Sequence, residues 1–254
     1  MKVFCQSSNE VLQINENNDL LSEGGEGYIF KVGNSSKYVA KIYKDPGRKS
    51  FDKIVAMLKN PPNDGITPGH TLFAWPKDLL KSDNSSGKLI GFVMPKITKA
   101  GGFIDVSSPF LRQKEHPNFT FRDLLTIGSN IVKAFSALHE KGYVIGDVNE
   151  CNILVTGSGL ISFVDTDSFQ VPDNDKKRVY RCPVYRPEFT PPELHGKDLN
   201  QTNRKIEHDL FGMGILLFQL FDYFTVEGGL IFWCSCALVL FRAASDPPPA
   251  DIAT

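Results

Sequence analysis

The stretch VIGDVNECNILV at residues 144–155, followed by FVD at 163–165, places three oxygen-bearing side chains at a defined spacing. Asn152 lies five positions after Asp147, and Asp165 follows thirteen positions later, at the end of an apolar run. Amide and carboxylate oxygens suit Mg²⁺, and a carboxylate can accept the proton of an attacking hydroxyl. The spacing therefore predicts a phosphotransferase centre, with Asp147 as base and Asn152 and Asp165 as magnesium ligands.

The same stretch predicts a small β-hairpin. Two short apolar runs, 153–155 and 160–164, flank the Gly-Ser-Gly turn at 157–159, which is a strand–turn–strand signal. An isolated Asp or Asn is usually a turn former, and the paired apolar runs weigh against that alternative here.

Length and composition limit the function classes. The 254 residues suffice for one large domain or two small lobes. A net charge of −1 provides no field that would attract nucleic acid or an anionic membrane. Five scattered cysteines argue against a disulfide framework and show no zinc spacing with the five histidines. We expect a cytoplasmic protein without a signal peptide, since the N-terminus has no long apolar core.

The two halves of the chain predict different structure. The first half has three strand-like runs and one helical pattern, at 28–32, 38–43, 89–94 and 50–59. The second half has two strong helical patterns, at 120–141 and about 208–221. This division predicts an α+β fold with a strand-rich lobe at 1–95 and a helical lobe at 96–221.

A glycine-rich turn, SEGGEGYI at residues 22–29, lies just before the hairpin of the first half. Glycines in such a turn let backbone amides approach phosphate oxygens, although taken alone the pattern is more often structural. Lys41 follows in the next predicted strand. A lysine in an apolar strand is either a solvated edge residue or one that is held by a partner.

The order and spacing of these motifs resemble those of protein kinases. The resemblance implies ATP and Mg²⁺ as cofactors, a phosphate turn with Ser22 in place of its first glycine, and a hinge at 94–97 that meets adenine. It also implies catalytic roles for Asp147, Lys41 and Asn152. The nucleotide-binding residues that it implies are Ser22, Gly24, Gly25, Gly27, Ile29, Lys41, Met94, Pro95 and Ile97.

Two later motifs extend the resemblance. TPPE at 190–193 resembles the end of a kinase activation segment, and HDLFGMG at 208–214 resembles the start of the central kinase helix. In that helix Asp209 is expected to hydrogen-bond the backbone of the catalytic loop. Within kinases, GDVNECN and DTDSFQ look most like an atypical bacterial group that is often fused to helix-hairpin-helix segments.

The chain departs from the kinase pattern around Lys41. No Glu occurs between Glu26 and Glu115, so the helical Glu that usually pairs with this lysine is missing. Asp52, the only acid in the expected helix, is therefore the candidate partner. Asp167 stands in the motif that follows the metal aspartate, where it could add to a metal site or cap the turn; we expect the turn.

Other departures surround the catalytic loop. Ile145 and Gly146 replace the His and Arg that precede the catalytic aspartate in kinases, so phosphorylation-dependent ordering of the activation segment is not expected. Asn149 replaces a Lys, which leaves neutralisation of the γ-phosphate without an obvious cation.

The resemblance ends at about residue 221. Residues 228–241 carry no charge, and they could form a buried helix, a weak membrane anchor or the aberrant end of a truncated frame; we expect the last, which makes the helical lobe incomplete. Residues 245–254 are expected to be disordered.

The leading hypothesis is an ATP- and magnesium-dependent protein kinase that phosphorylates Ser or Thr of an unknown protein substrate. One rival is a pseudokinase, meaning a nucleotide-binding scaffold with little transfer activity. The other is a small-molecule phosphotransferase, against which the TPPE segment argues because peptide docking has no use there.

Overall fold

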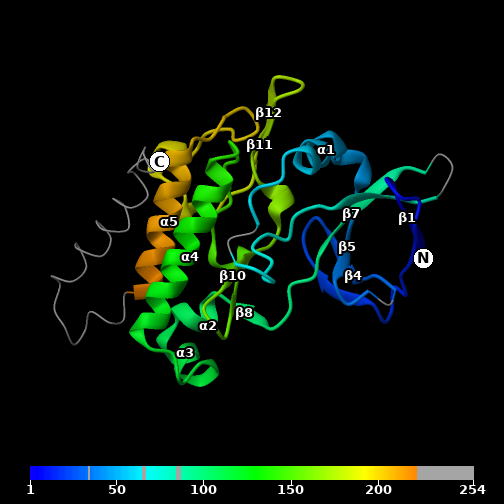
Figure 1. The fold of residues 1–254 in the computed structure, drawn as a ribbon. Helices are drawn as coiled ribbons and strands as arrows, with labels where there is room; N and C mark the ends of the chain where they lie inside the picture. Colours follow the sequence, from blue (N-terminus) through cyan, green and yellow to red (C-terminus); the bar gives the residue numbers. More distant parts are fainter. Residues whose placement is uncertain (34, 65–66, 84–86, 222–254) are drawn as a thin grey trace, which may run out of the picture.

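The computed structural model describes residues 1–33, 35–64, 67–83 and 87–221, which form two lobes (Figure 1). The N-terminal lobe is built on a seven-stranded antiparallel sheet with the order β2-β1-β6-β7-β5-β4-β3. Its strands are β1 (Lys2–Cys5), β2 (Val11–Gln13), β3 (Leu20–Glu23), β4 (Gly27–Lys31), β5 (Tyr38–Tyr43), β6 (Asp78–Lys81) and β7 (Leu89–Pro95).

Strand β5 divides its side chains between two hydrophobic cores, because successive residues of a strand point to opposite faces. Ala40 and Ile42 belong to a small core on one face of the sheet. Val39 and Tyr43 belong to the main core on the other face. The alternation therefore places Lys41 on the side of the main core, although it is a charged residue.

Helix α1 (Phe51–Lys59) packs on this same side, with Ile54 and Met57 buried in the main core. The helix expected at 50–59 is therefore confirmed. It ends at Lys59 with Asn60 as its C-cap, directly before two prolines that cannot continue it.

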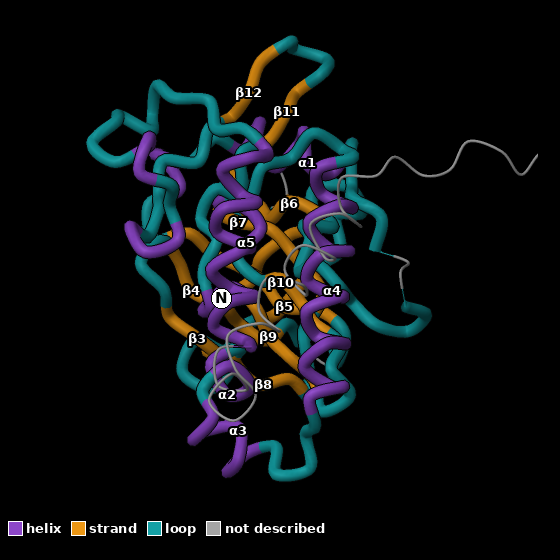
Figure 2. The backbone as a smooth tube through the Cα atoms, turned by 90° about the vertical axis from the view of Figure 1, so that its left-hand side faces the viewer, coloured by secondary structure: helices purple, strands orange, loops and turns teal. Residues whose placement is uncertain are grey.

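The C-terminal lobe is mainly helical. Helices α4 (Phe121–His139) and α5 (Ile206–Phe221) lie side by side, and the short helices α2 (Ile104–Ser107) and α3 (Pro109–Glu115) lie near one end of the pair (Figures 1 and 2). A capping box between Thr120 and Asp123 starts α4 where the sequence predicts it. The helix ends at His139, two residues before the predicted end.

Two small hairpins complete this lobe. Strand β9 (Ile153–Thr156) pairs with β10 (Ile161–Phe163) on one side and with β8 (Ala100–Gly102) on the other. Strand β11 (Val171–Asp173) pairs with β12 (Arg178–Tyr180). The predicted central hairpin is thus confirmed. Four 3-10 turns lie in the described part of this lobe: η2 (Glu150–Asn152), η3 (Thr166–Ser168), η4 (Pro187–Phe189) and η5 (Pro192–Leu194). Another, η1 (Pro46–Arg48), lies between β5 and α1 in the N-terminal lobe.

The main core joins the two lobes. Phe73, which precedes β6 in the chain, contacts Phe163 of β10 with 6.1 Å between ring centroids. The ring of Phe135, on α4, lies 5.8 Å from that of Phe163 on the other side. The backbone N–H of Ala74 also donates to the carbonyl of Phe163 at 2.8 Å. The hairpin that carries the motif residues is therefore anchored to both lobes.

The predictions for residues 222–254, including those for 228–241 and 245–254, lie outside the described residues. Within the described residues, no helix combines the length and apolarity needed to cross a membrane.

We expect Phe135→Ala to lower the free energy of unfolding by about 3–5 kcal/mol, because the ring is 1% exposed and its removal leaves a cavity. Phe110→Ala is the matched control. Its ring is 76% exposed, so the change should stay within about 0.5 kcal/mol. Urea denaturation measures both, and equal losses in the two variants would contradict this description of the core.

Candidate active site

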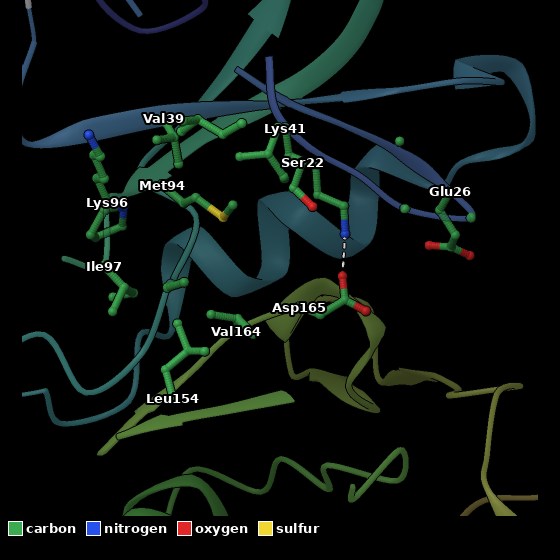
Figure 3. Close-up of a pocket in the computed structure, with 17 residues that line it drawn as sticks. Ser22, Glu26, Val39, Lys41, Met94, Lys96, Ile97, Leu154, Val164 and Asp165 are labelled. Carbon is green, nitrogen blue, oxygen red and sulfur yellow. Dashed lines mark hydrogen bonds and ion pairs between the residues drawn. The ribbon is translucent and has the colours of Figure 1, made fainter. Parts of the chain in front are cut away.

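A cavity of about 610 Å³ lies between the two lobes (Figure 3). All nine nucleotide-binding residues that the sequence suggests line it, and so does Asp165. The other lining residues are Leu21, Glu26, Val39, Ala74, Lys96, Leu154 and Val164. Glu26 and Lys96 lie within the predicted glycine turn and hinge. Val39, Leu154 and Val164 lie in predicted strands, whereas the sequence carries no signal for Leu21 and Ala74.

The cavity has an apolar part and a charged part. Val39 and Met94 from the N-terminal lobe face Leu154 and Val164 from the C-terminal lobe, and Ile97 lies at the same end (Figure 3). Lys41 and Asp165 lie toward the other end. A flat apolar group flanked by these side chains would direct its polar extension toward the charged end.

The glycine turn forms one edge of the charged part. Its backbone closes on itself, with the N–H of Gly24 donating to the carbonyl of Gly27 at 2.9 Å. A Cβ at Gly27 would lie 2.6 Å from the carbonyl oxygen of Ile42, so this position needs glycine for strand pairing. A Cβ at Gly25 would meet no atom within 4 Å.

Lys41 is held by two carboxylates. Its Nζ lies 2.5 Å from Oδ1 of Asp165 and 2.6 Å from Oδ1 of Asp167. Burial lowers the pKa of Lys41, but Asp167 and Asp165 outweigh it and hold that pKa above its usual range. The ammonium therefore stays charged at neutral pH.

Asp167 is enclosed more completely than Asp165. Its second oxygen, Oδ2, accepts a hydrogen bond from the Tyr43 hydroxyl at 2.7 Å, and its side chain is 3% exposed, against 44% for Asp165. Burial raises the pKa of Asp167, but the Lys41 charge and the hydrogen bonds from Lys41 and Tyr43 hold it below its usual value. The expected turn-capping role of Asp167 is wrong, since its carboxylate binds the side chains of Lys41 and Tyr43 on β5 instead of the backbone of its own turn.

Asp52 is not the partner of Lys41. It lies at the N-terminal end of α1 and pairs with Nζ of Lys176 and Nη2 of Arg178, each at 2.8 Å. Asp52 does not reach Lys41 because the first turn of α1 faces the β11–β12 hairpin, whereas Lys41 points toward the turn that carries Asp165 and Asp167.

Asp147 and Asn152 are brought together as the sequence predicts. Nδ2 of Asn152 donates to the backbone oxygen of Asp147 at 3.0 Å and to its Oδ2 at 3.2 Å. Asp147 and Asp165 both line a second, smaller cavity of about 210 Å³, which also borders Lys53. Asp165 is thus shared between the two cavities.

The loop that carries Asp147 is held by Asp209 of α5. Its carboxylate accepts the backbone N–H groups of Ile145 at 2.7 Å and Gly146 at 2.8 Å, and it contacts Nε2 of His139 at 2.9 Å. The expectation for Asp209 is therefore confirmed.

Asn152 and Asp165 have the donor atoms that a magnesium site needs. The backbone oxygen of Asn152 accepts the N–H of Val164 at 2.9 Å, which places Asn152 and Asp165 at neighbouring ends of the hairpin. Among the residues that the structure describes, no group of three or more His, Cys, Asp or Glu side chains could hold a metal alone. These two residues fit a metal that takes its remaining ligands from phosphate and water.

The chain is similar in sequence to proteins that are named as protein kinases. No protein-family model matches the sequence. The proteins named Protein kinase YegI from Escherichia coli O157:H7 and from strain K12 are each 32% identical to the chain over 202 residues. The match covers 79% of this chain and 30% of each relative, so the chain spans about a third of the length of these curated relatives.

Solved structures show the same fold. The ROP18 kinase domain in complex with AMP-PNP and sucrose has a TM-score of 0.59 at 14% identity, covering 87% of this chain and 67% of that chain. A Toxoplasma gondii specific rhoptry antigen kinase domain has a TM-score of 0.61 at 13% identity, with 96% and 77% covered.

The chain belongs to the protein kinase-like superfamily. The predicted α+β fold, with a strand-rich lobe followed by a helical lobe, is confirmed. Residues 165–193, from the predicted metal aspartate to the end of TPPE, are called the activation segment below, after the kinase segment that they resemble.

A buried arginine supports the activation segment of this kinase-like domain. Gly146, which has a φ of 73°, leaves no room for a side chain, because a Cβ there would come within 2.8 Å of Nη1 of Arg204. Nη2 of Arg204 donates to the backbone oxygen of Val184 at 2.6 Å. A guanidinium from a later part of the chain thus lies beside the position where kinases carry their Arg.

We expect Gly27→Ala to lower the free energy of unfolding of the nucleotide-free protein by about 1–3 kcal/mol, because its Cβ would clash with the β5 backbone. Gly25→Ala should change it by no more than about 0.5 kcal/mol. Chemical denaturation compares the two variants, and equal stability would contradict the close approach of β4 and β5.

The stabilisation that Asp167 provides should depend on pH. Because folding lowers its pKa, its contribution is complete above the unfolded-state pKa of about 3.9 and is lost as the pH falls through the folded-state value. The difference in unfolding free energy between the wild type and Asp167→Asn should therefore shrink below about pH 4. Urea denaturation from pH 7 to pH 3 measures this, and a difference that does not vary with pH would contradict it.

Proposed function

We propose that the chain is an ATP- and magnesium-dependent protein kinase that transfers the γ-phosphate to Ser or Thr hydroxyls. The observation that carries this proposal is that a glycine turn, a buried lysine and Asp165 line one cavity. Asp165 also lines the smaller cavity that holds Asp147, to which Asn152 is hydrogen-bonded. We also propose a cytoplasmic location, supported by the three free cysteines among the described residues.

The larger cavity fits a nucleotide. Its volume of about 610 Å³ is within the usual range for small-molecule sites. Adenine would lie between Val39 and Leu154, with the backbone of Pro95 and Ile97 at its polar edge. The ROP18 kinase domain, which has the same fold, is in complex with AMP-PNP, and this supports nucleotide binding by the chain.

The charged end of the cavity fits the phosphates. The Lys41 ammonium would contact the α- and β-phosphates, and the amides of the glycine turn would cover them. Asn152 and Asp165 would hold Mg²⁺, which neutralises phosphate charge when it is bound.

Asp147 would orient the acceptor hydroxyl at the mouth of the smaller cavity. The hydroxyl oxygen forms a bond to the γ-phosphorus while the bond from that phosphorus to the β–γ bridging oxygen breaks and ADP leaves. The proton of the hydroxyl passes to Asp147. Its backbone oxygen is fixed by Nδ2 of Asn149, at 3.0 Å, and by Asn152.

One observation favours the second candidate, a nucleotide-binding scaffold without transfer activity. Asn149 is 2% exposed, and its side chain is used to bind the Asp147 and Cys151 backbone. It therefore cannot provide the cation that kinases place there. Lys53, which lines the smaller cavity together with Asp147 and donates to the Ser168 carbonyl at 3.2 Å, is a candidate substitute.

The test is phosphate transfer from γ-labelled ATP with Mg²⁺ to the chain itself or to generic protein acceptors. We expect Asp147→Asn to reduce the rate by about 10²–10⁴-fold, the usual contribution of a positioned acid–base group. Glu207→Gln, an exposed acid on α5, is the matched control and should keep the wild-type rate.

Three results would contradict the kinase proposal. Nucleotide binding without any transfer would favour the scaffold. Transfer to small metabolites alone would favour the small-molecule phosphotransferase. Equal rates in the wild type and Asp147→Asn would remove Asp147 from the reaction.

A further inference from the structure

The two acids that hold Lys41 come from one turn rather than from a helix. Asp165 and Asp167 flank Thr166 in and beside η3, whose Thr166 hydroxyl donates to the Ala74 carbonyl at 3.0 Å. The Ser168 hydroxyl closes the same turn by donating to the Asp165 carbonyl at 2.8 Å. The turn is therefore fixed to the N-terminal lobe independently of Lys41.

Helix α1 has no acid to offer to Lys41. Asp52 is the only carboxylate between Phe51 and Lys59, and the β11–β12 hairpin occupies it. At the other end of the helix, Lys59 pairs with Asp175 of the same hairpin at 2.6 Å. The ion pairs of Asp52 and Lys59 on α1 are thus made with the activation segment.

The two acids of the turn are not equivalent. Asp165 lines both cavities and is partly exposed, so it is available to a metal. Asp167 is absent from the walls of the nucleotide cavity, and both of its oxygens are used, one by Lys41 and the other by Tyr43. If Asp165 bound a metal, Asp167 would still hold the ammonium through its own contact with Nζ.

We propose that Asp167 is the positioning residue for Lys41, and that it replaces a helical glutamate so that the lysine is held in place independently of α1. This role rests on the proposed function, in which Lys41 contacts the nucleotide phosphates. Its consequence is mechanical. Displacement of α1 would break its contact with the turn, from Lys53 Nζ to the Ser168 carbonyl, but no ion pair of Lys41. Displacement of the η3 turn would move the lysine and the metal ligand together.

Calorimetry with ADP and with adenosine, both in the presence of Mg²⁺, tests this role without requiring catalysis. Adenosine lacks the phosphates that Lys41 would contact, so it reports on the apolar part of the cavity alone. We expect Asp167→Asn to weaken ADP binding at least about tenfold, as for loss of a charge-assisted contact, and to change adenosine binding less than about twofold. Asp52→Asn is the control on α1 and should leave both affinities within about twofold.

A double-mutant cycle separates positioning from general damage to the fold. In a Lys41→Met background, Asp167→Asn should weaken ADP binding no further, because it acts only through the lysine. Tyr43→Phe, which removes one hydrogen bond from Asp167, should shift ADP affinity in the same direction by a smaller factor, and it serves as the test if Asp167→Asn does not fold.

Each other outcome identifies what fails. Unchanged ADP affinity in Asp167→Asn, or in Tyr43→Phe where that variant replaces it, overturns the positioning role. An equal loss of adenosine affinity overturns it too, and so does a loss of ADP affinity that persists in the Lys41→Met background. A loss of ADP affinity in Asp52→Asn as large as in Asp167→Asn has the same meaning. A wild-type chain that binds neither ligand overturns the proposed function itself. ADP binding without phosphate transfer contradicts the kinase proposal. In that case the ADP affinities of the wild type and Asp167→Asn still test the positioning role of Asp167.

Discussion

The buried ion cluster of Lys41, Asp165 and Asp167 is the interaction on which the cleft depends. Burying the Lys41 ammonium without a carboxylate would destabilise the fold, and so would burying the carboxylate of Asp167 without the ammonium. The lysine comes from β5 and the acids from the turn after β10, which are 124 and 126 positions away in the chain. The pairing therefore fixes the N-terminal sheet over the hairpin that carries Asn152. It also requires the Tyr43 hydroxyl to stay protonated, and burial and the Asp167 charge raise the pKa of that group accordingly.

The activation segment is held by groups that need no modification. Asp52 binds Lys176 and Arg178 at the edge of the hairpin, where exposed pairs are individually weak but share one carboxylate. The stronger restraint is the buried Arg204, whose guanidinium reaches the Val184 carbonyl beside Gly146. These contacts fit the expectation from Gly146 that a phosphate is not required to order the segment.

The sequence was most informative where function requires particular residues at particular spacing. The glycine turn, Lys41, the hinge and Asp165 were all predictable as motifs, and the structure brings them to one cavity. The partner of Lys41 was not predictable, because a single sequence does not reveal which distant acid meets a buried lysine. Asp52 has the expected place on a helix, yet the orientation of α1 directs it to the hairpin. An Asp in the position of Asp167 usually binds local backbone in a turn, whereas burial and tertiary contact determine its role here.

A crystal structure of the chain with Mg²⁺ and a non-hydrolysable ATP analogue would test the central claim most directly. The account predicts that Nζ of Lys41 contacts both Asp167 and an α- or β-phosphate oxygen, while Asn152 and Asp165 coordinate the metal and Asp167 does not. A metal bound by Asp167, or a Lys41 that has left Asp167 for a group on α1, would contradict it.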